Sequence, residues 1–271
     1  MSQIPPAGIL DLMSNRGVNV AAELAMRWCK RGGKSLGDYL EFGTYRGSSF
    51  TAFFRAAQRH DVTDMRFYGF DSFEGLPETP TCPPDEDPTE TAFVAGNYSC
   101  SEEEFRHIVA FRGVDLSRVT LVPGFFDQSL TEELKVDLAI ASAGIVNIDC
   151  DLYESTVDVL NFVTSLLRSG SLILFDDWLS YDAHPLRGEQ RACREWLEEH
   201  PEIHLTEYFK YTRTGVAFIV SMLTPYEQQV MQRDAGARGG VGRDADRSRT
   251  AAPMDSEDGD LPAETEPGPP V

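Results

Sequence analysis

The sequence is short of cysteines, of long apolar runs and of basic residues. Its five cysteines are scattered and include no C-x-x-C pair, which fits free thiols in a reducing cytoplasm better than disulfides or a zinc site. No run of about 18 apolar residues occurs, so we expect no membrane span. The first residues lack a basic flank followed by an apolar segment, so we expect no secretory signal.

The shortage of basic residues leaves the chain strongly acidic. There are 24 Lys and Arg residues against 44 Asp and Glu residues, and the formal net charge is −20. This charge would repel nucleic acid phosphates and anionic membranes, so we expect neither as a partner. Solubility is the simplest reason for it. The 271 residues, 41% of them hydrophobic, are enough to bury the core of one large domain.

The pattern along the chain predicts three parts. Residues 1–36 form a helical cap, residues 37–224 an α/β domain, and residues 225–271 an acidic, disordered tail. The tail is rich in Gly and Pro and poor in aromatic residues, so it cannot bury enough apolar surface to offset its ordering entropy. Within the domain, residues 72–98 are Pro-rich and typical of a lid or a disordered insertion.

Strand-like and helix-like segments alternate through the domain. This alternation predicts a parallel sheet with helices on both faces. The last two strands are separated by only a few residues, which requires an antiparallel hairpin. The predicted strands are 38–42, 66–70, 119–122, 145–148, 171–175, 204–210 and 215–220, and the clearest helices are 48–60, 101–111 and 155–168.

The first predicted strand leads into a glycine-containing turn, in the sequence YLEFGTYRGSSF. A glycine between strand and helix lets a ligand approach the backbone closely. Tyr45 stands where a dinucleotide-binding turn has its second glycine, so a pyrophosphate would be crowded. A ligand without phosphates that carries an amino acid end suits this turn better, and Glu41 can lie near its ammonium group. A purely structural turn is the alternative.

Asp71 ends the second predicted strand, 28 residues after Gly43. A carboxylate at this point of an α/β sheet can accept hydrogen bonds from both hydroxyls of a bound ribose. The alternative is an aspartate that merely opens the following loop.

Four aspartates follow two apolar strands. Uncompensated carboxylates at the ends of buried strands would repel one another, and a hard divalent cation held by oxygens is the natural compensator. Helix capping is the alternative, although capping needs only one aspartate per helix. The four are Asp149 and Asp151 after strand 145–148, and Asp176 and Asp177 after strand 171–175.

Taken together, YLEFGTYRGSSF, FYGFDSFEGLPE, NIDCDLYEST and LILFDDW resemble the macrocin O-methyltransferase (TylF-type) family over roughly residues 36–220. Members of this family are class I S-adenosylmethionine-dependent enzymes that methylate sugar hydroxyls in antibiotic biosynthesis. The resemblance implies a Rossmann-like α/β sheet, mostly parallel with a C-terminal antiparallel hairpin and helices on both faces.

The resemblance also implies two cofactors, S-adenosylmethionine and Mg²⁺, and the residues that bind them. The implied metal ligands are Asp149, Asp176 and Asp177, and the implied general base is Asp151. The implied cofactor-binding residues are Glu41, Gly43, Thr44, Tyr45, Gly47, Ser48, Asp71, Ser72, Gly124, Phe126 and Asp149.

The sequence therefore predicts a cytoplasmic, Mg²⁺-dependent O-methyltransferase that acts on a hydroxyl of a sugar or another small secondary metabolite. A homo-oligomer is left open as the assembly state. One alternative is a nucleotide-dependent oxidoreductase of Rossmann type, against which the missing second glycine and the hairpin both count. The other is a non-catalytic cofactor-binding protein with the methyltransferase fold, against which the four retained aspartates count.

Overall fold

The computed structural model describes residues 9–30, 36–78 and 93–233, and the side chains from residue 16 onward. Two compact units, Met1–Pro225 and Tyr226–Val271, make up the chain. The first unit contains the helices α1 (Ile9–Cys29), α2 (Ser48–Arg59), α3 (Glu102–Phe111), α4 (Phe126–Ser129), α5 (Glu132–Asp137), α6 (Tyr153–Val163) and α7 (Gly188–Glu199). Its strands are β1 (Asp38–Phe42), β2 (Phe67–Asp71), β3 (Val119–Pro123), β4 (Ala143–Ile148), β5 (Leu172–Phe175), β6 (Ile203–Lys210) and β7 (Val216–Met222).

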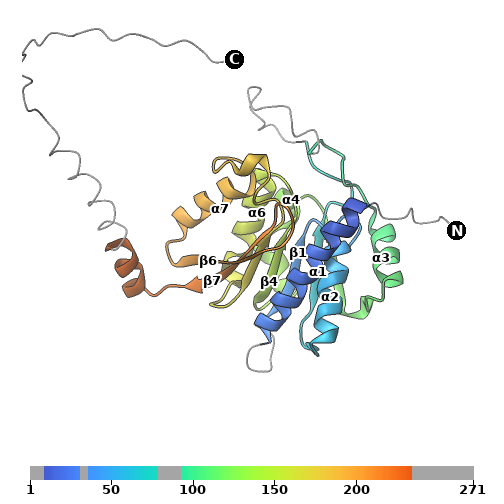
Figure 1. Cartoon of the computed structure of the whole chain (residues 1–271), viewed down its shortest axis with the longest axis horizontal. Coiled ribbons are helices and arrows are strands. Elements are labelled where there is room, and N and C mark those ends of the chain that lie inside the picture. The colour runs from blue at the N-terminus through green and yellow to red at the C-terminus, as the bar shows by residue number, and fades with distance from the viewer. Residues whose placement is uncertain (1–8, 31–35, 79–92, 234–271) are drawn as a thin grey trace, which may run out of the picture. The chain divides into compact units, whose positions relative to one another are not determined.

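The seven strands form one sheet in the order β3-β2-β1-β4-β5-β7-β6 (Figure 1). Strands β1 to β5 pair in parallel, whereas β7 runs antiparallel to both β5 and β6. The predicted fold class, a mostly parallel sheet that ends in an antiparallel hairpin, is therefore confirmed. Every predicted strand is present, and each boundary lies within two residues of its expected position.

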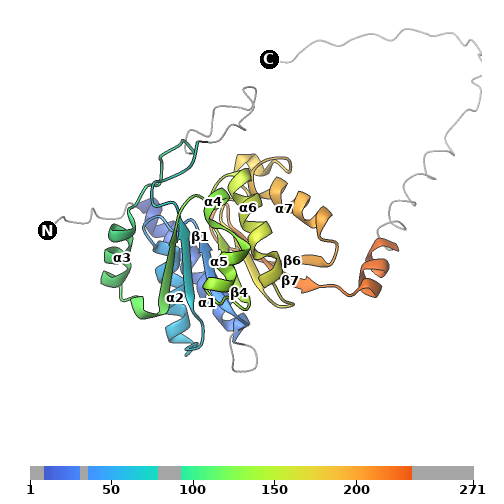
Figure 2. The same cartoon turned by 180° about the vertical axis from the view of Figure 1, so that it is seen from behind.

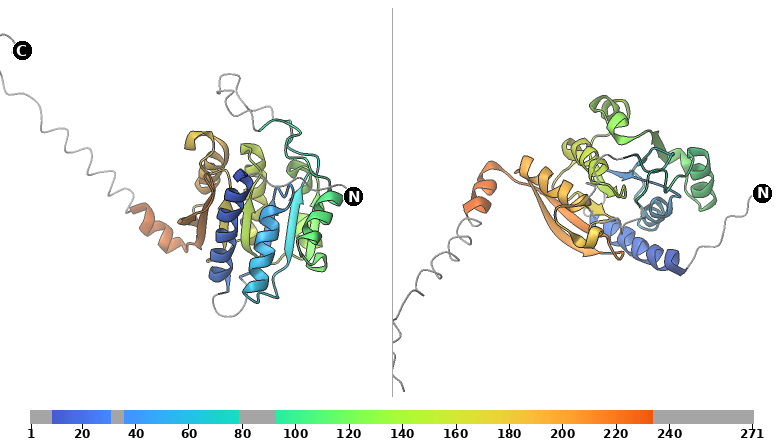
Figure 3. Two further views of the ribbon diagram at one scale, coloured as in Figure 1. Left: turned by 45° about the vertical axis from the view of Figure 1, so that its right-hand side comes forward. Right: turned by 90° about the horizontal axis from the view of Figure 1, so that it is seen from above.

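Helices cover both faces of the sheet, because alternate side chains of each strand point to opposite faces. On one face, α1, α2 and α3 pack on strand residues such as Tyr39 and Ile145. On the other, α6 and α7 pack on Phe42 and Ile148. Figure 2 shows α4, α5 and α6 on this second face, and the view from above in Figure 3 shows the sheet between α1 and α6. The two clusters form the layered core.

Local signals explain where several helices begin and end. Ser101 caps α3 by accepting a hydrogen bond from the backbone N–H of Glu104, and Thr131 caps α5 through the N–H of Leu134. The predicted helix 155–168 begins earlier, at Tyr153, and α6 passes into a 3₁₀ turn at Thr164. Short helices such as α4 and α5 have too few residues for a periodic pattern, so the sequence did not reveal them.

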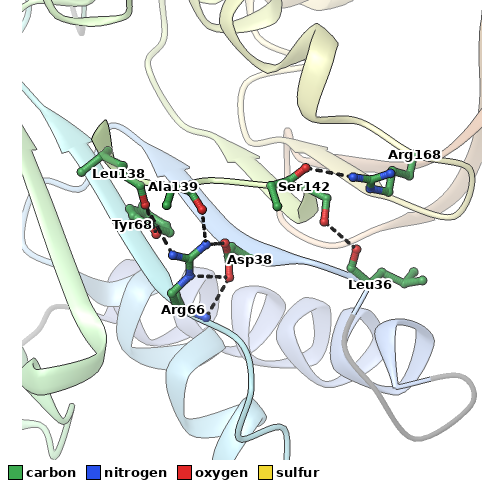
Figure 4. A network of polar contacts seen from close by, with 9 residues as sticks. Leu36, Asp38, Arg66, Tyr68, Leu138, Ala139, Ser142 and Arg168 are labelled. Carbon is green, nitrogen blue, oxygen red and sulfur yellow. Dashed lines mark hydrogen bonds and ion pairs between the residues drawn. The ribbon is translucent and has the colours of Figure 1, made fainter. Parts of the chain in front are cut away.

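A polar network ties the amino ends of the strands together (Figure 4). The Arg66 guanidinium is paired with the buried Asp38 at 2.6 Å and donates to the carbonyl oxygen of Ala139 at 2.8 Å. Tyr68 donates to the carbonyl oxygen of Leu138 at 3.2 Å. This network joins β1, β2 and the segment before β4, so it fixes the sheet at the edge opposite the ends of the strands that carry the aspartates.

Two predicted segments extend beyond the described residues. The predicted insertion 72–98 includes residues 79–92, which lie outside the described part of the chain, as do residues 234–271 of the predicted tail. Residues 225–233, where the tail was expected to begin, are helical. In the described ranges, no helix is long and apolar enough to cross a membrane.

Candidate active site

The strand register brings the carboxyl ends of four parallel strands level with one another. Phe42 pairs with Phe70 on one side and with Ile148 on the other, and Ile148 in turn pairs with Phe175. The next residue along each strand therefore lies in one row at the edge of the sheet. That row is Asp71, Gly43, Asp149 and Asp176. Residues more than a hundred positions apart are brought together in this way, at the edge where α/β sheets bind ligands.

A cleft of about 1000 Å³ opens above this row. It is lined by the glycine turn, by the loops after β2 and β3, and by the aspartates after β4 and β5. Among the described residues that line it, nine are acidic and none is basic. The acidic ones are Asp71, Glu78, Asp127, Asp149, Asp151, Glu154, Asp158, Asp176 and Asp177.

Three of these carboxylates form a cluster. Asp149, Asp176 and Asp177 each offer an oxygen, and the three oxygens lie within 4.8 Å of one another. Burial, together with the charges of Asp176 and Asp151, raises the pKa of Asp149 well above its ordinary value. Burial and the adjacent Asp177 raise the pKa of Asp176 to about 7. The cluster lies where the sequence predicts a metal, and a bound cation would compensate the like charges of its ionised form.

The alternative of helix capping does not account for these aspartates. The N-cap of α6 is Leu152, which makes no side-chain capping bond, rather than Asp151. Asp177 accepts a hydrogen bond from the Ser180 hydroxyl at 2.8 Å, which orders the local turn and leaves its other carboxylate oxygen for a ligand. Asp151 lines the cleft with a backbone φ of 64°, a strained conformation for a residue other than glycine.

The glycine turn and Asp71 are joined directly. One carboxylate oxygen of Asp71 accepts hydrogen bonds from the backbone N–H groups of Thr44, at 2.6 Å, and Tyr45, at 3.0 Å. Its other oxygen accepts one bond, from the N–H of Phe73 at 2.7 Å. Asp71 therefore positions the turn and still has acceptor capacity that faces the cleft.

Seven of the eleven residues predicted to bind the cofactor line the cleft. They are Gly43, Tyr45, Asp71, Ser72, Gly124, Phe126 and Asp149. The other four lie behind the turn. Thr44 is buried and bonded to Asp71, Gly47 packs against Val109 of α3, and Ser48 begins α2.

Glu41 is the fourth residue behind the turn. It is fully buried, and its carboxylate accepts hydrogen bonds from Tyr39 and, at 2.6 Å, from Ser49. Burial raises its pKa to about 8. Because Tyr39 and Glu41 share one face of β1, the Glu41 side chain points under α2, and its carboxylate is not part of the cleft wall.

Two polar or aromatic residues after β5 take no part in the cleft wall. His184 is exposed, and Trp178 packs against Phe175 and Phe218. Two polar residues behind the aspartate cluster, Glu189 and Tyr211, were not predicted as site residues. Glu189 opens α7 and Tyr211 follows β6, and neither element carries a motif that marks it.

The sequence of the chain matches a known enzyme family. The model of the family described as macrocin O-methyltransferase (TylF) matches residues 32–202, which is more than half of the chain. A demethyldecarbamoylnovobiocin O-methyltransferase of Streptomyces niveus is 30% identical over 151 residues, or 53% of each chain. A rhamnosyl-tetracenomycin C 4'-O-methyltransferase of Streptomyces olivaceus is 32% identical over 147 residues, 52% of this chain and 53% of its own. The matched part thus spans about half the length of these curated relatives.

Solved structures agree on the fold. The O-methyltransferase NovP superposes with a TM-score of 0.62 at 22% identity, over 76% of this chain and 80% of its own. The calicheamicin methyltransferase CalS11 superposes with a TM-score of 0.57 at 19% identity, over 74% and 77%. The domain therefore has the class I methyltransferase fold, and the chain belongs to the macrocin O-methyltransferase (TylF) family.

Proposed function

We propose that the chain is an S-adenosylmethionine-dependent O-methyltransferase that acts on a hydroxyl of a sugar or another small secondary metabolite, with the help of Mg²⁺. The observation that carries the proposal is the row at the sheet edge. It sets a glycine turn and Asp71 beside three clustered carboxylates, Asp149, Asp176 and Asp177, in one cleft.

The cleft suits S-adenosylmethionine, which supplies an electrophilic methyl group on a sulfonium. Its acidic lining favours a ligand that carries a sulfonium and an ammonium group. Phe126 offers an aromatic surface for a purine, and Asp71 offers acceptor oxygens for ribose hydroxyls. Tyr45 lines the position at which an oxidoreductase would bind a pyrophosphate, which counts against that alternative.

The aspartate cluster suits a hard divalent cation. Three carboxylate oxygens within 4.8 Å are the donors that Mg²⁺ prefers, with its remaining positions open to other oxygens. When bound, the ion would supply Lewis acidity toward an acceptor hydroxyl. Asp149, Asp176 and Asp177 would hold it, and their repulsion explains why the protein would favour its binding.

Asp151 is the residue that we assign as general base. It lies in the cleft wall one residue beyond Cys150 and two beyond Asp149, and its strained backbone is typical of a residue held for a functional reason. In the proposed reaction an Asp151 carboxylate oxygen would accept the proton of the acceptor hydroxyl, and the acceptor oxygen would form the new bond to the methyl carbon. The methyl–sulfur bond of the sulfonium would break at the same time, and its electron pair would stay on the sulfur of S-adenosylhomocysteine, the leaving group. Cys150 is buried, and burial raises the pKa of its thiol, so it is a poor nucleophile.

The test begins with binding and continues with methyl transfer. Calorimetry of the full chain should show micromolar affinity for S-adenosylmethionine, about −8 kcal/mol. Transfer of a labelled methyl group to a panel of neutral glycosides is then measured with Mg²⁺, with EDTA, and after Mg²⁺ is restored. We expect activity to be lost in EDTA and recovered with the ion, because the carboxylate cluster needs its cation.

Asp151→Asn is the matched variant. It should keep metal binding and lower turnover roughly 10²–10⁴-fold, as for a lost general base. Full activity in EDTA would refute the metal dependence. Tight cofactor binding without methyl transfer to any glycoside would favour the non-catalytic alternative.

A further inference from the structure

Two buried polar groups lie behind the aspartate cluster, and neither is part of the cleft lining. The Glu189 side chain is only 1% exposed, and one of its oxygens accepts a hydrogen bond from the backbone N–H of Asp177 at 3.0 Å. Its other oxygen is buried and has no hydrogen-bond partner among the described residues. Burial and the charges of the three clustered aspartates and of Asp151 raise the pKa of Glu189 well above its ordinary value, so this oxygen lies within their field.

Tyr211 approaches the same cluster from the hairpin. Its hydroxyl is buried, and burial together with the charge of Asp176 raises its pKa well above the ordinary value, so the hydroxyl lies in the field of that carboxylate. Within the described residues, however, it makes no hydrogen bond of normal geometry. A buried hydroxyl and a buried carboxylate oxygen that lack hydrogen-bond partners both destabilise the folded protein, so we expect each to serve a compensating interaction.

The position of Tyr211 is set by close packing with two glycines. A Cβ atom on Gly17 of α1 would collide with the Tyr211 carbonyl oxygen, and one on Gly215 would lie 2.5 Å from the tyrosine ring. The backbone N–H of Tyr211 donates to the Gly215 carbonyl oxygen at 3.1 Å. Helix α1 therefore packs on the backbone of Tyr211 and the β6–β7 turn packs on its ring, which leaves the residue little freedom to move.

We propose that Glu189 and Tyr211 are positioning residues of the metal site, which hold Asp177 and Asp176 in the arrangement that binds a divalent cation. This inference rests on the metal site of the proposed function. Glu189 anchors the backbone of Asp177. The Tyr211 hydroxyl has no partner in the metal-free site, and it would donate to the Asp176 carboxylate once a bound cation keeps that group ionised. Outer partners of this kind fix the ligands of protein metal sites, and their loss typically lowers metal affinity 10–100-fold. Helix α1 gains a role through Tyr211, because it supports the site without entering the cleft.

The experiment is a titration of the full-length protein with Mn²⁺, a hard oxygen-seeking ion that is visible by electron paramagnetic resonance. We expect Tyr211→Phe to raise the Mn²⁺ dissociation constant about 10-fold and to alter the spectrum of the bound ion. The metal-free variant should melt at or slightly above the wild-type temperature, because it loses only an unpaired buried hydroxyl. Tyr68→Phe is the matched control. It removes a bonded hydroxyl distant from the cluster, so it should lower the melting temperature and leave Mn²⁺ affinity unchanged.

Glu189 is tested with a pair of variants. Glu189→Gln keeps an oxygen for the N–H of Asp177 and should stay within about 3-fold of the wild-type affinity, whereas Glu189→Ala should lose about 10-fold or more. An unchanged Mn²⁺ affinity and spectrum in both Tyr211→Phe and Glu189→Ala would overturn this inference and leave the metal site standing. Failure of the wild-type protein to bind Mn²⁺ would overturn the metal site and this inference together.

Discussion

Asp71, which was predicted to bind a ribose, accepts hydrogen bonds from the glycine turn. Three of its four hydrogen bonds come from Thr44 and Tyr45, so the carboxylate stabilises the conformation of the glycine turn. A ribose would share the same carboxylate. One residue would therefore couple the shape of the turn to cofactor binding, and its removal should affect both.

Asp71→Ala should weaken S-adenosylmethionine binding by roughly 1–3 kcal/mol, since the charge-assisted hydrogen bonds to the cofactor and those that stabilise the glycine turn are lost together. Calorimetry measures the loss. Thr44→Val is the comparison, because it removes only the 3.1 Å hydroxyl bond to Asp71 and should cost less. An affinity unchanged in Asp71→Ala would remove this residue from the cofactor site.

The buried carboxyls make stability depend on pH in an unusual direction. Asp176 and Glu41 have folded-state pKa values of about 7 and about 8, above those of the unfolded chain. Between pH 4 and 8 the unfolded chain therefore binds fewer protons than the folded protein, and the free energy of unfolding falls as pH rises. The stabilising contribution of these two groups is fully lost once the pH is above their folded-state pKa values. The metal-free protein should melt at a higher temperature at pH 5 than at pH 8.

Calorimetric melting in EDTA across this pH interval checks the prediction, with Asp176→Asn as the control. The variant cannot ionise at this position, so its melting temperature should fall less between pH 5 and pH 8. Saturating Mg²⁺ should also reduce the decrease in melting temperature between pH 5 and pH 8, because a bound cation would stabilise the ionised cluster. A melting temperature that rises with pH in EDTA would contradict the assigned burial of these groups.

At the scale of elements, the β1–α2 turn depends on one backbone conformation. Gly43 has a φ of 84°, and a Cβ atom there would collide with the carbonyl oxygen of Asp149. The turn and Asp149, the first of the proposed metal ligands, are thus in direct backbone contact. The glycine is required for close approach to β4 as well as for the turn itself.

Gly43→Ala should therefore disturb cofactor and metal binding together, in addition to destabilising the fold. Gly113→Ala is the matched control, since Gly113 has a φ of 88° but nothing within 4 Å of the added methyl group. This control substitution should lower the free energy of unfolding only by the strain of the left-handed backbone conformation, about 1–2 kcal/mol. Melting temperature and S-adenosylmethionine affinity are measured for both. Equal losses in the two variants would mean that the contact with Asp149 is unimportant.

At the scale of the whole molecule, the acidity of the chain is continued inside its cleft. Nine acidic residues line the cleft, and no basic residue does so among those described. The proposed sulfonium cofactor and divalent cation would together leave most of these carboxyl groups without a compensating positive charge. A cleft of one sign attracts ligands of the opposite sign and repels those of its own.

An acceptor that carries a diphosphate should accordingly be disfavoured. The same sugar should be methylated at least about tenfold less efficiently as a nucleoside diphosphate ester than as a neutral glycoside, in terms of kcat/KM. Higher ionic strength should narrow the difference by screening. The measurement compares both acceptors at two salt concentrations. A higher kcat/KM for the nucleotide-linked sugar at low salt would contradict the inference that the acidic cleft repels a diphosphate.

The sequence by itself determined the strands, the hairpin and the aspartates of the site. Strand periodicity is local, so runs such as LILF and the alternation around them identify elements without tertiary contacts. Parallel strands end at a common edge, so aspartates that follow strands were expected to meet there. The cluster of Asp149, Asp176 and Asp177 bears this out. The predicted disorder of residues 79–92 of the insertion and of residues 234–271 of the tail stays a prediction, because both ranges lie outside the described residues.

Only the tertiary structure decided which polar residues stand behind that edge. Gly47 packs on α3, Glu41 is enclosed beneath α2, and Glu189 and Tyr211 reach the aspartate cluster from α7 and the hairpin. These contacts join segments that are distant in the sequence, and their geometry depends on strand order and helix packing. A repeating local pattern specifies which face a side chain takes, but it carries no information about which distant element will lie against that face.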